Sequence, residues 1–191
     1  VVQDDSPHDL SVLKTVQVIV EAINDGPTIA GPDLVEAEED TPLFLPGVRV
    51  EDPDCDDALR GMLEVSITAS NGTVQFLGSM AGLYLMETLP GSLKIRGKTN
   101  PVNVALAGLS YTGAPEFSGD DSIVVTADDM GNSGGGGRLR AMMSVNVTVA
   151  AVNDAPEILV PPELNTTAGG VLFVVEDTPT PLGTFGISDP D

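Results

Sequence analysis

Short acidic phrases punctuate this sequence and carry its clearest chemistry. They are Asn24-Asp25, Glu39-Asp40, Asp52-Pro53-Asp54, Asn153-Asp154 and Asp189-Pro190-Asp191. Carboxylate and amide oxygens are the ligands that Ca²⁺ prefers, six to eight at a time, and extracellular modules bind it at roughly 10⁻⁴ to 10⁻³ M. An alternative stays open, because Asn-Asp can cap a turn and Asp-Pro can end a strand. The acids therefore predict either calcium sites or solvated turns.

Other metal chemistry fits the sequence less well. Residues 52–56 resemble the start of an EF-hand loop, but Asp57 stands where that loop needs Gly, and Leu63 where it needs a bidentate Glu. The single His8 and the single Cys55 remove the usual zinc sites and the common nucleophile–base pairs. A lone Cys says little about redox compartment.

We expect no enzyme. Carboxylate pairs could serve a glycosidase, but 29 Asp and Glu make pairs inevitable, and Tyr84 and Tyr111 are the two Tyr in a chain without Trp. Residues 134–137 are all Gly, but no Lys-Ser or Lys-Thr follows them, so they form no phosphate-binding loop.

Composition favours an all-β protein with a solvated or cation-binding surface. The chain is 41% hydrophobic but only 4% aromatic, so its core must rest on Val, Leu and Ile, which suit strands. The 21 Gly and 15 Pro indicate many turns. Eight Lys and Arg against 29 Asp and Glu give a net charge of −21, which repels nucleic acid and anionic lipid. No apolar run approaches 18 residues, so we expect no membrane insertion in this segment.

The acidic phrases recur because the sequence is a tandem array. VQVIVEAINDGP at residues 16–27 returns as VNVTVAAVNDAP at residues 145–156, and EDTP at 39–42 returns at 176–179. We therefore expect residues 1–24 to end one repeat, 25–153 to form a complete one, and 154–191 to begin a third, so that the chain is part of something longer.

Hydrophobic periodicity predicts the elements of the complete repeat. A partly regular strand is expected over residues 28–38, a return over 43–50, and strands over 63–69, 74–77, 83–86, 93–96, 109–112, 122–127 and 139–150. Ser70-Asn71-Gly72-Thr73 predicts a two-residue type I′ hairpin. Asn100 and Pro101 predict the cap and first position of one short helix, and residues 128–137 a flexible loop. Seven or more antiparallel strands make a β-sandwich.

Several phrases in order resemble a known family. NDAP, EDT, DPD, LAGLSYTG and FSGDDSIVVTADDMGN closing on VNVTVAAVNDAP resemble the tandem cadherin-like or immunoglobulin-like repeats of giant adhesins and of surface or matrix filament proteins. The resemblance covers nearly all of the chain and implies extracellular sandwiches strung end to end, often with calcium at the joints. Similar repeats occur in filamentous surface proteins, flagellar hairs among them. Gly26 in place of Ala departs from the pattern.

Two functions are compatible with that resemblance. One is a structural spacer of a large cell-surface or extracellular protein, with neighbouring repeats and other copies or other proteins as partners. The alternative is a ligand-binding adhesin domain. An apolar or aromatic patch on the loop at residues 128–137 would favour adhesion, and the sequence there has none, so we favour the spacer.

Strand direction assigns the acids to two ends of the repeat. A strand of about ten residues at roughly 3.3 Å each crosses one module, so successive strands deliver their ends to opposite poles. The upper joint is predicted to gather Asn24, Asp25, Asp52, Asp54 and Asp128. The lower joint is predicted to gather Glu39, Asp40, Glu116, Asp120, Asn153, Asp154, Asp189 and Asp191.

Three Asn-X-Ser/Thr sequons predict glycosylation if the chain passes through a eukaryotic secretory route. Asn146 alternates with the apolar Val145 and Val147, so it should point outward, and Asn165 lies in a predicted loop. Asn71 is a weaker acceptor because its turn is tight. Intact glycopeptide mass spectrometry of the native protein should find glycans on Asn146 and Asn165. Two bare sites would contradict the prediction.

Overall fold

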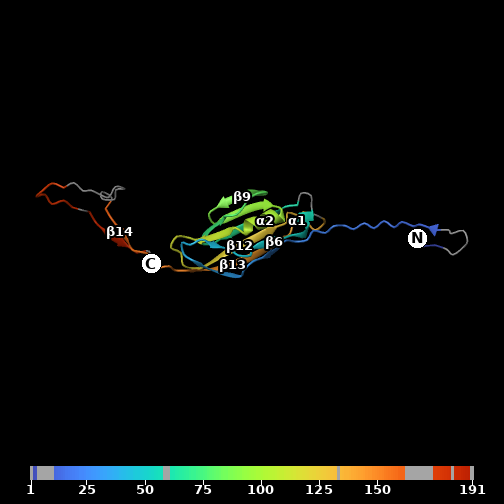
Figure 1. The fold of residues 1–191 in the computed structure, drawn as a ribbon, viewed down its shortest axis with the longest axis horizontal. Coiled ribbons are helices and arrows are strands. Elements are labelled where there is room, and N and C mark those ends of the chain that lie inside the picture. Colours follow the sequence, from blue (N-terminus) through green and yellow to red (C-terminus); the bar gives the residue numbers. More distant parts are fainter. Residues whose placement is uncertain are drawn as a thin grey trace.

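The computed structural model describes residues 2–3, 11–57, 61–132, 134–161, 174–181 and 183–189. Its centre is a β-sandwich, and the chain leaves that body at opposite ends toward the two termini (Figure 1). Within the described residues, no helix is long and apolar enough to cross a membrane.

The larger sheet has six strands and forms one layer of the sandwich. Its order is β4 (Leu34–Glu38), β13 (Arg140–Ala150), β12 (Gly119–Asp128), β7 (Leu63–Ala69), β10 (Ser92–Gly97) and β9 (Leu83–Leu89). All neighbours pair antiparallel except β4, which runs parallel to β13. Strands β4 and β9 are therefore its two edges.

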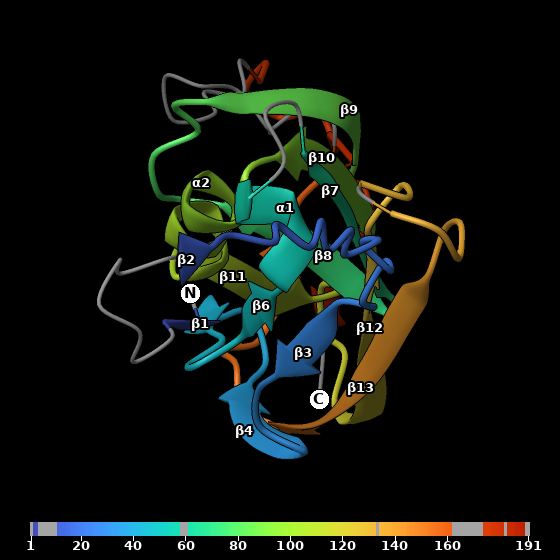
Figure 2. The ribbon, with the colours of Figure 1, turned by 90° about the vertical axis from the view of Figure 1, so that its right-hand side faces the viewer.

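The opposite layer is smaller. It holds β5 (Leu43–Phe44), β11 (Leu109–Gly113) and β8 (Gly72–Phe76), with β11 in the middle, and the pair β3 (Thr28–Ala30) and β6 (Arg49–Glu51). Helix α2 (Thr99–Leu106) and the short α1 (Pro53–Asp57) lie on this side of β7, β12 and β13 (Figure 2). The chain is an all-β sandwich, as its composition and periodicity predict.

Short strand pairs flank the sandwich. The pair β1 (Val2–Gln3) and β2 (Ser11–Val12) precedes it, and the pair β14 (Glu157–Leu159) and β15 (Gly186–Ser188) follows it. The β14–β15 pair has the register of β3–β6, in which Thr28 lies opposite Glu51, because Glu157 lies opposite Ser188. In both pairs the next residue is an Asp followed by Pro, Asp52 and Asp189 respectively.

Strand alternation builds the core. Val145, Val147 and Val149 of β13 are buried while the residues between them are exposed. Strand β12 buries Ile123, Val125 and Ala127, and the residues between them are half-buried. Helix α2 adds three buried apolar residues, Val102, Ala105 and Leu106, at helical spacing. In the segment over residues 43–50, Leu45, Val48 and Val50 are buried as expected, and Leu43 is half-buried.

The predicted hairpin at Asn71-Gly72 is wrong. Strand β7 pairs with β10 and β12, whereas β8 pairs with β11 in the other sheet, so the turn is a corner between layers. Neither Asn71 nor Gly72 has the positive φ that a type I′ turn requires. The hairpin lies at Pro90-Gly91, where Leu89 of β9 faces Ser92 of β10.

Two helix expectations also need correction. The sequence predicts one short helix, but Pro53–Asp57 forms a second, begun by Asp52, whose Oδ1 accepts a hydrogen bond from Cys55 N at 2.8 Å. Helix α2 begins at Thr99, before Asn100, and its N-cap Lys98 makes no side-chain capping bond. The Asn100 side chain is therefore not the cap.

The long strand expected over residues 28–38 is divided. Its first part, β3, pairs with β6, and its second part, β4, crosses to the six-stranded sheet and pairs with β13. A chain that starts in one layer and ends in the other closes that side of the sandwich.

A buried tyrosine fixes the corner at Asn71. Tyr111 is fully buried, and its hydroxyl donates to Asp121 Oδ2 at 2.6 Å. Asp121 in turn accepts from Asn71 N at 3.0 and 3.1 Å. A Cβ on Gly72 would lie 2.5 Å from the Tyr111 ring, so the turn needs Gly for close approach. Burial and the Asp121 carboxylate raise the pKa of Tyr111, which therefore stays protonated as a donor.

We expect Tyr111→Phe to lower the free energy of unfolding by about 1.5–3 kcal/mol, because it removes a buried hydrogen bond to a charged group. Tyr84→Phe is the matched control, since Tyr84 is 61% exposed on β9. Urea unfolding of both variants measures the difference. Equal stabilities would show that the bond to Asp121 contributes nothing.

Candidate functional site

The linker enters the sandwich through two side-chain contacts at what we call the upper end. Asn24 is buried, and its Nδ2 donates to Asp129 Oδ2 at 2.5 Å and to Gly137 O at 3.0 Å. The next residue, Asp25, donates its backbone N–H to Asp54 Oδ2 at 2.5 Å. These contacts bring Asn24, Asp25 and Asp54 together, as their predicted grouping requires.

Asp52 lies in the same group and has an unusual environment. The residue is 4% exposed, its Oδ1 caps α1, and its Oδ2 has no hydrogen-bond partner. Burial raises the pKa of Asp52, and the nearby Asp129 and Asp54 carboxylates add to that rise, against hydrogen bonds from the backbone of Cys55 and Asp54. A buried carboxylate oxygen without a partner, among other acids, suits a bound cation.

Asp128 does not take part in this group, although its position in the chain suggests it. Its Oδ1 accepts from Arg138 Nε and its Oδ2 from Arg140 Nε, each at 2.5 Å. Burial acts to raise the pKa of Asp128, but the hydrogen bonds from Arg138 and Arg140 outweigh it, and the pKa is lowered. The carboxylate is therefore neutralised by arginine on the outside of the sheet.

Asp129, and not Asp128, contacts the linker at the upper end. It is fully buried, and its Oδ1 accepts from Gly131 N and Leu139 N, both at 2.8 Å, while its Oδ2 meets Asn24. Successive residues at a strand end point to opposite faces, so only one of two adjacent acids can reach the linker. The alternation of buried Val125 and Ala127 would have identified Asp129.

The glycine-rich loop holds the linker backbone. Gly135 accepts from Asn24 N at 2.8 Å and donates to Ala22 O at 3.0 Å, which forms a parallel β-bridge between Ile23 and Gly135. Gly134 has φ +73°, and a Cβ there would lie 2.5 Å from the carbonyl of Ala22. The loop predicted to be flexible thus has a specific contact, which its run of glycines permits.

A second group of acids lies at the other end of the sandwich, which we call the lower end. Carboxylate oxygens of Asp40, Glu116 and Asp154 all lie within 4.8 Å of one another, and the side chains of Asp40 and Glu116 are exposed. These residues come from three separate turns, after β4, after β11 and after β13. Among the residues that the structure describes, these three form the group whose spacing suits a metal ion.

The other acids predicted for the lower end have different partners. Glu39 is buried, and its Oε1 accepts from Val152 N at 2.6 Å. Asp120 accepts from Thr148 Oγ1 at 3.2 Å, and Asn153 Nδ2 donates to Asp154 O at 3.1 Å. Asp189 is exposed after β15, and Asp191 lies outside the described residues.

The predicted glycan acceptors are placed as follows. Asn146 is exposed on β13 between buried Val145 and Val147, and Asn71 is exposed at the corner between layers. Asn165 lies outside the described residues. Glycosylation of these positions stays a prediction.

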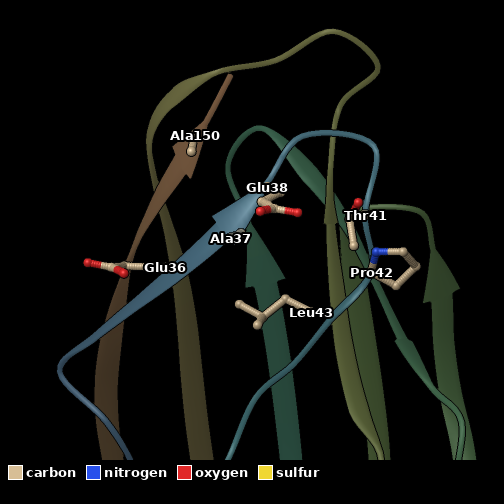
Figure 3. Close-up of a pocket in the computed structure, with 7 residues that line it drawn as sticks. All are labelled: Glu36, Ala37, Glu38, Thr41, Pro42, Leu43 and Ala150. Carbon is tan, nitrogen blue, oxygen red and sulfur yellow. The ribbon is translucent and has the colours of Figure 1, made fainter. Parts of the chain in front are cut away.

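An open groove of about 420 Å³ lies near the lower end between β4 and β5 (Figure 3). It is lined by Glu36, Ala37, Glu38, Thr41, Pro42, Leu43 and Ala150. In the view of Figure 3, the Glu36 side chain points away from Thr41 and Pro42, whereas the Glu38 side chain points toward them. The lining of this open surface groove therefore combines small apolar side chains with one hydroxyl and two carboxylates.

Comparisons with known proteins add little to this picture. No protein-family model and no curated protein matches the chain. The solution structure of CaCohA2 from Clostridium acetobutylicum is similar over 66% of this chain and 92% of its own, with 13% sequence identity and a TM-score of 0.41. Similarity at that level carries no inference about function.

We expect Gly134→Ala to release the linker, because the new methyl group meets the Ala22 carbonyl and the residue must keep a positive φ. Gly135→Ala is the control, since a Cβ there meets nothing within 4 Å. Hydrogen exchange at the amides of Asn24 and Gly135 should accelerate at least about tenfold in Gly134→Ala alone. Unchanged exchange would show that the bridge does not depend on Gly134.

Proposed function

We propose that this chain is a structural spacer of a large extracellular or cell-surface repeat protein, of the fibre, matrix or flagellar-hair type. In this role it would determine the length of the protein, because each module contacts mainly its neighbours along the chain. No catalytic step is assigned to it. The anchored linker at the upper end is the observation that carries the proposal.

Three features support a role as a spacer that determines length. Asn24 enters at the upper end and Asp154 leaves at the lower end, so successive modules would extend the chain without folding it back (Figure 1). The loop bridge at Gly135 fixes the entering backbone. The equal registers of β3–β6 and β14–β15 fit a following module that starts as this one does.

Calcium at the joints is part of the proposal. At the upper end, the buried and unpartnered Asp52 Oδ2 is the atom that would meet a cation. At the lower end, Asp40, Glu116 and Asp154 have a spacing suited to an ion. A bound ion would neutralise the clustered acids and stiffen the joint.

A ligand-binding adhesin domain is the second candidate. One observation favours it, a groove of about 180 Å³ between β8 and β9, lined by apolar side chains that include Val74, Phe76, Met80, Leu85 and Leu93. An adhesin would lose cell binding in Leu85→Asp, whereas a spacer would keep its length and lose nothing.

The test is small-angle scattering of a protein with three or more repeats, in millimolar calcium and in excess chelator. We expect an elongated particle in both, with a shorter maximum dimension after chelation because the joints bend. Calcium at about ten times its Kd should also raise stability by about 1.4 kcal/mol, or roughly 3–6 °C in melting temperature.

Asp52→Asn keeps the shape of the side chain and removes its charge, so the calcium-dependent rise should shrink. Asp33→Asn is the control, because Asp33 is exposed and away from both acidic groups. A compact particle would refute the spacer. An elongated particle with the same melting temperature in calcium and in chelator would support the spacer function and refute calcium binding at the joints.

A further inference from the structure

Asp129 closes the base of the loop that follows β12. Its Oδ1 accepts hydrogen bonds from Gly131 N and from Leu139 N, both at 2.8 Å. The first donor lies at the start of the loop and the second at its end, so one carboxylate oxygen holds the two ends together. We call residues 130–132 and 134–138 the latch, because its other contacts reach the linker.

Asp128 closes the same base from the outer face of the sheet. Its Oδ1 accepts from Met130 N at 2.9 Å and from Arg138 Nε at 2.5 Å. The Asp128 side chain is only 6% exposed, and the Arg138 guanidinium also lies 3.9 Å from a Glu64 carboxylate oxygen. Two adjacent carboxylates therefore each bind both ends of the latch.

The latch depends on this closure because its own backbone is costly to order. Residues 134–137 are four consecutive glycines, and glycine loses more conformational entropy on ordering than any other residue. Met130 has φ +58°, a left-handed conformation that is unfavourable for a residue with a side chain. Joining the two ends lowers the entropy cost of ordering the residues between them.

The latch contacts the linker close to Arg138. Gly137 O, one residue before Arg138, accepts from Asn24 Nδ2 at 3.0 Å, and Gly135 O accepts from Asn24 N at 2.8 Å. Gly135 N donates to Ala22 O at 3.0 Å. Movement of Arg138 would therefore move the carbonyl groups that bind Asn24.

We propose that Arg138 is a positioning residue for the linker, and that its ion pairs on the outer face set how tightly the latch holds Asn24. While Arg138 binds Asp128, the latch is closed. When Arg138 is released, the glycines gain freedom and the linker separates, while the sandwich stays folded. The consequence for the stiffness of the joint rests on the proposed spacer function, whereas the latch itself does not.

Arg140 shows why release of Arg138 should leave the sandwich intact. Arg140 Nε donates to Asp128 Oδ2 at 2.5 Å, so two arginines share one carboxylate. Arg140 begins β13 and pairs with Asp128 in the ladder between β12 and β13, whereas Arg138 lies outside any strand. The sheet holds Arg140 in place without its ion pair, and only Arg138 transmits the loss of an ion pair to the linker.

The ion pairs make the latch sensitive to ionic strength. The Arg138 side chain is 45% exposed, so salt screens its attraction to Asp128 and Glu64. At high salt the latch would hold the linker less tightly, and the upper joint would bend more easily. The buried core of the sandwich has no such dependence, because it is apolar.

Hydrogen exchange of the full chain at the amides of Asn24 and Gly135 tests the proposal. Both amides should exchange about fivefold faster in Arg138→Gln, because a surface ion pair is lost, while the amide of Val125 in the middle of the sheet keeps its rate. Arg140→Gln is the matched control, since it removes the other guanidinium from the same carboxylate and should leave the linker amides unchanged. Arg138→Lys keeps the charge and should restore part of the protection.

Salt provides a second measurement, which needs no variant. Raising the salt concentration from about 0.05 M to about 0.5 M should accelerate exchange at Asn24 about twofold in the native protein and in Arg140→Gln. In Arg138→Gln the same change should have no effect, because the screened ion pair is already absent.

Three results would overturn the proposal. They are equal exchange at Asn24 in Arg138→Gln and the native protein, equal acceleration in Arg138→Gln and Arg140→Gln, and native exchange that is independent of salt. Acceleration at Val125 together with Asn24 would also overturn it, because the whole sandwich would then open. A compact particle in scattering would instead refute the spacer and leave these exchange rates as they are.

Discussion

The contact between Asn24 Nδ2 and Asp129 Oδ2 fixes how the linker enters the sandwich, because it joins the linker to the end of strand β12. A buried acid is costly unless its oxygens are hydrogen-bonded. Asp129 meets that requirement with two backbone N–H donors and the linker amide. Asp52, close by, meets it at only one oxygen. At the upper end, both Asp129 oxygens therefore have hydrogen-bond donors, whereas one oxygen of Asp52 has none.

Strand parity explains how adjacent acids come to do different things. Asp128 and Asp129 are neighbours in sequence, yet one is bound by two arginines on the outer face and the other faces the linker. The same parity puts Asn146 and Arg140 on the outer face of β13 while Val145 and Val147 fill the core. A period of two residues thus separates the chemistry of the joint from that of the lateral surface.

Sequence patterns predicted the core strands well, because burial of alternate residues depends only on neighbours along the chain. The Asn71-Gly72 turn shows where such reasoning fails, since turn residues indicate a reversal but not the sheet to which the next strand belongs. Placing the acids at two ends needed only strand length and direction. Choosing Asp129 over Asp128, or finding the bridge at Gly135, required knowing which strand ends meet the linker.

The two groups of acids differ in how much a bound cation would stabilise them. Carboxylates that lie close together repel one another until a cation is bound, so the stiffness of both joints would depend on calcium. At the lower end, Asp40 and Glu116 are exposed, and exposed carboxylates are already solvated. At the upper end, Asp52 is buried and its Oδ2 has no hydrogen-bond partner, which is costly for a charged group. The upper end would therefore gain more stability from a bound ion than the lower end.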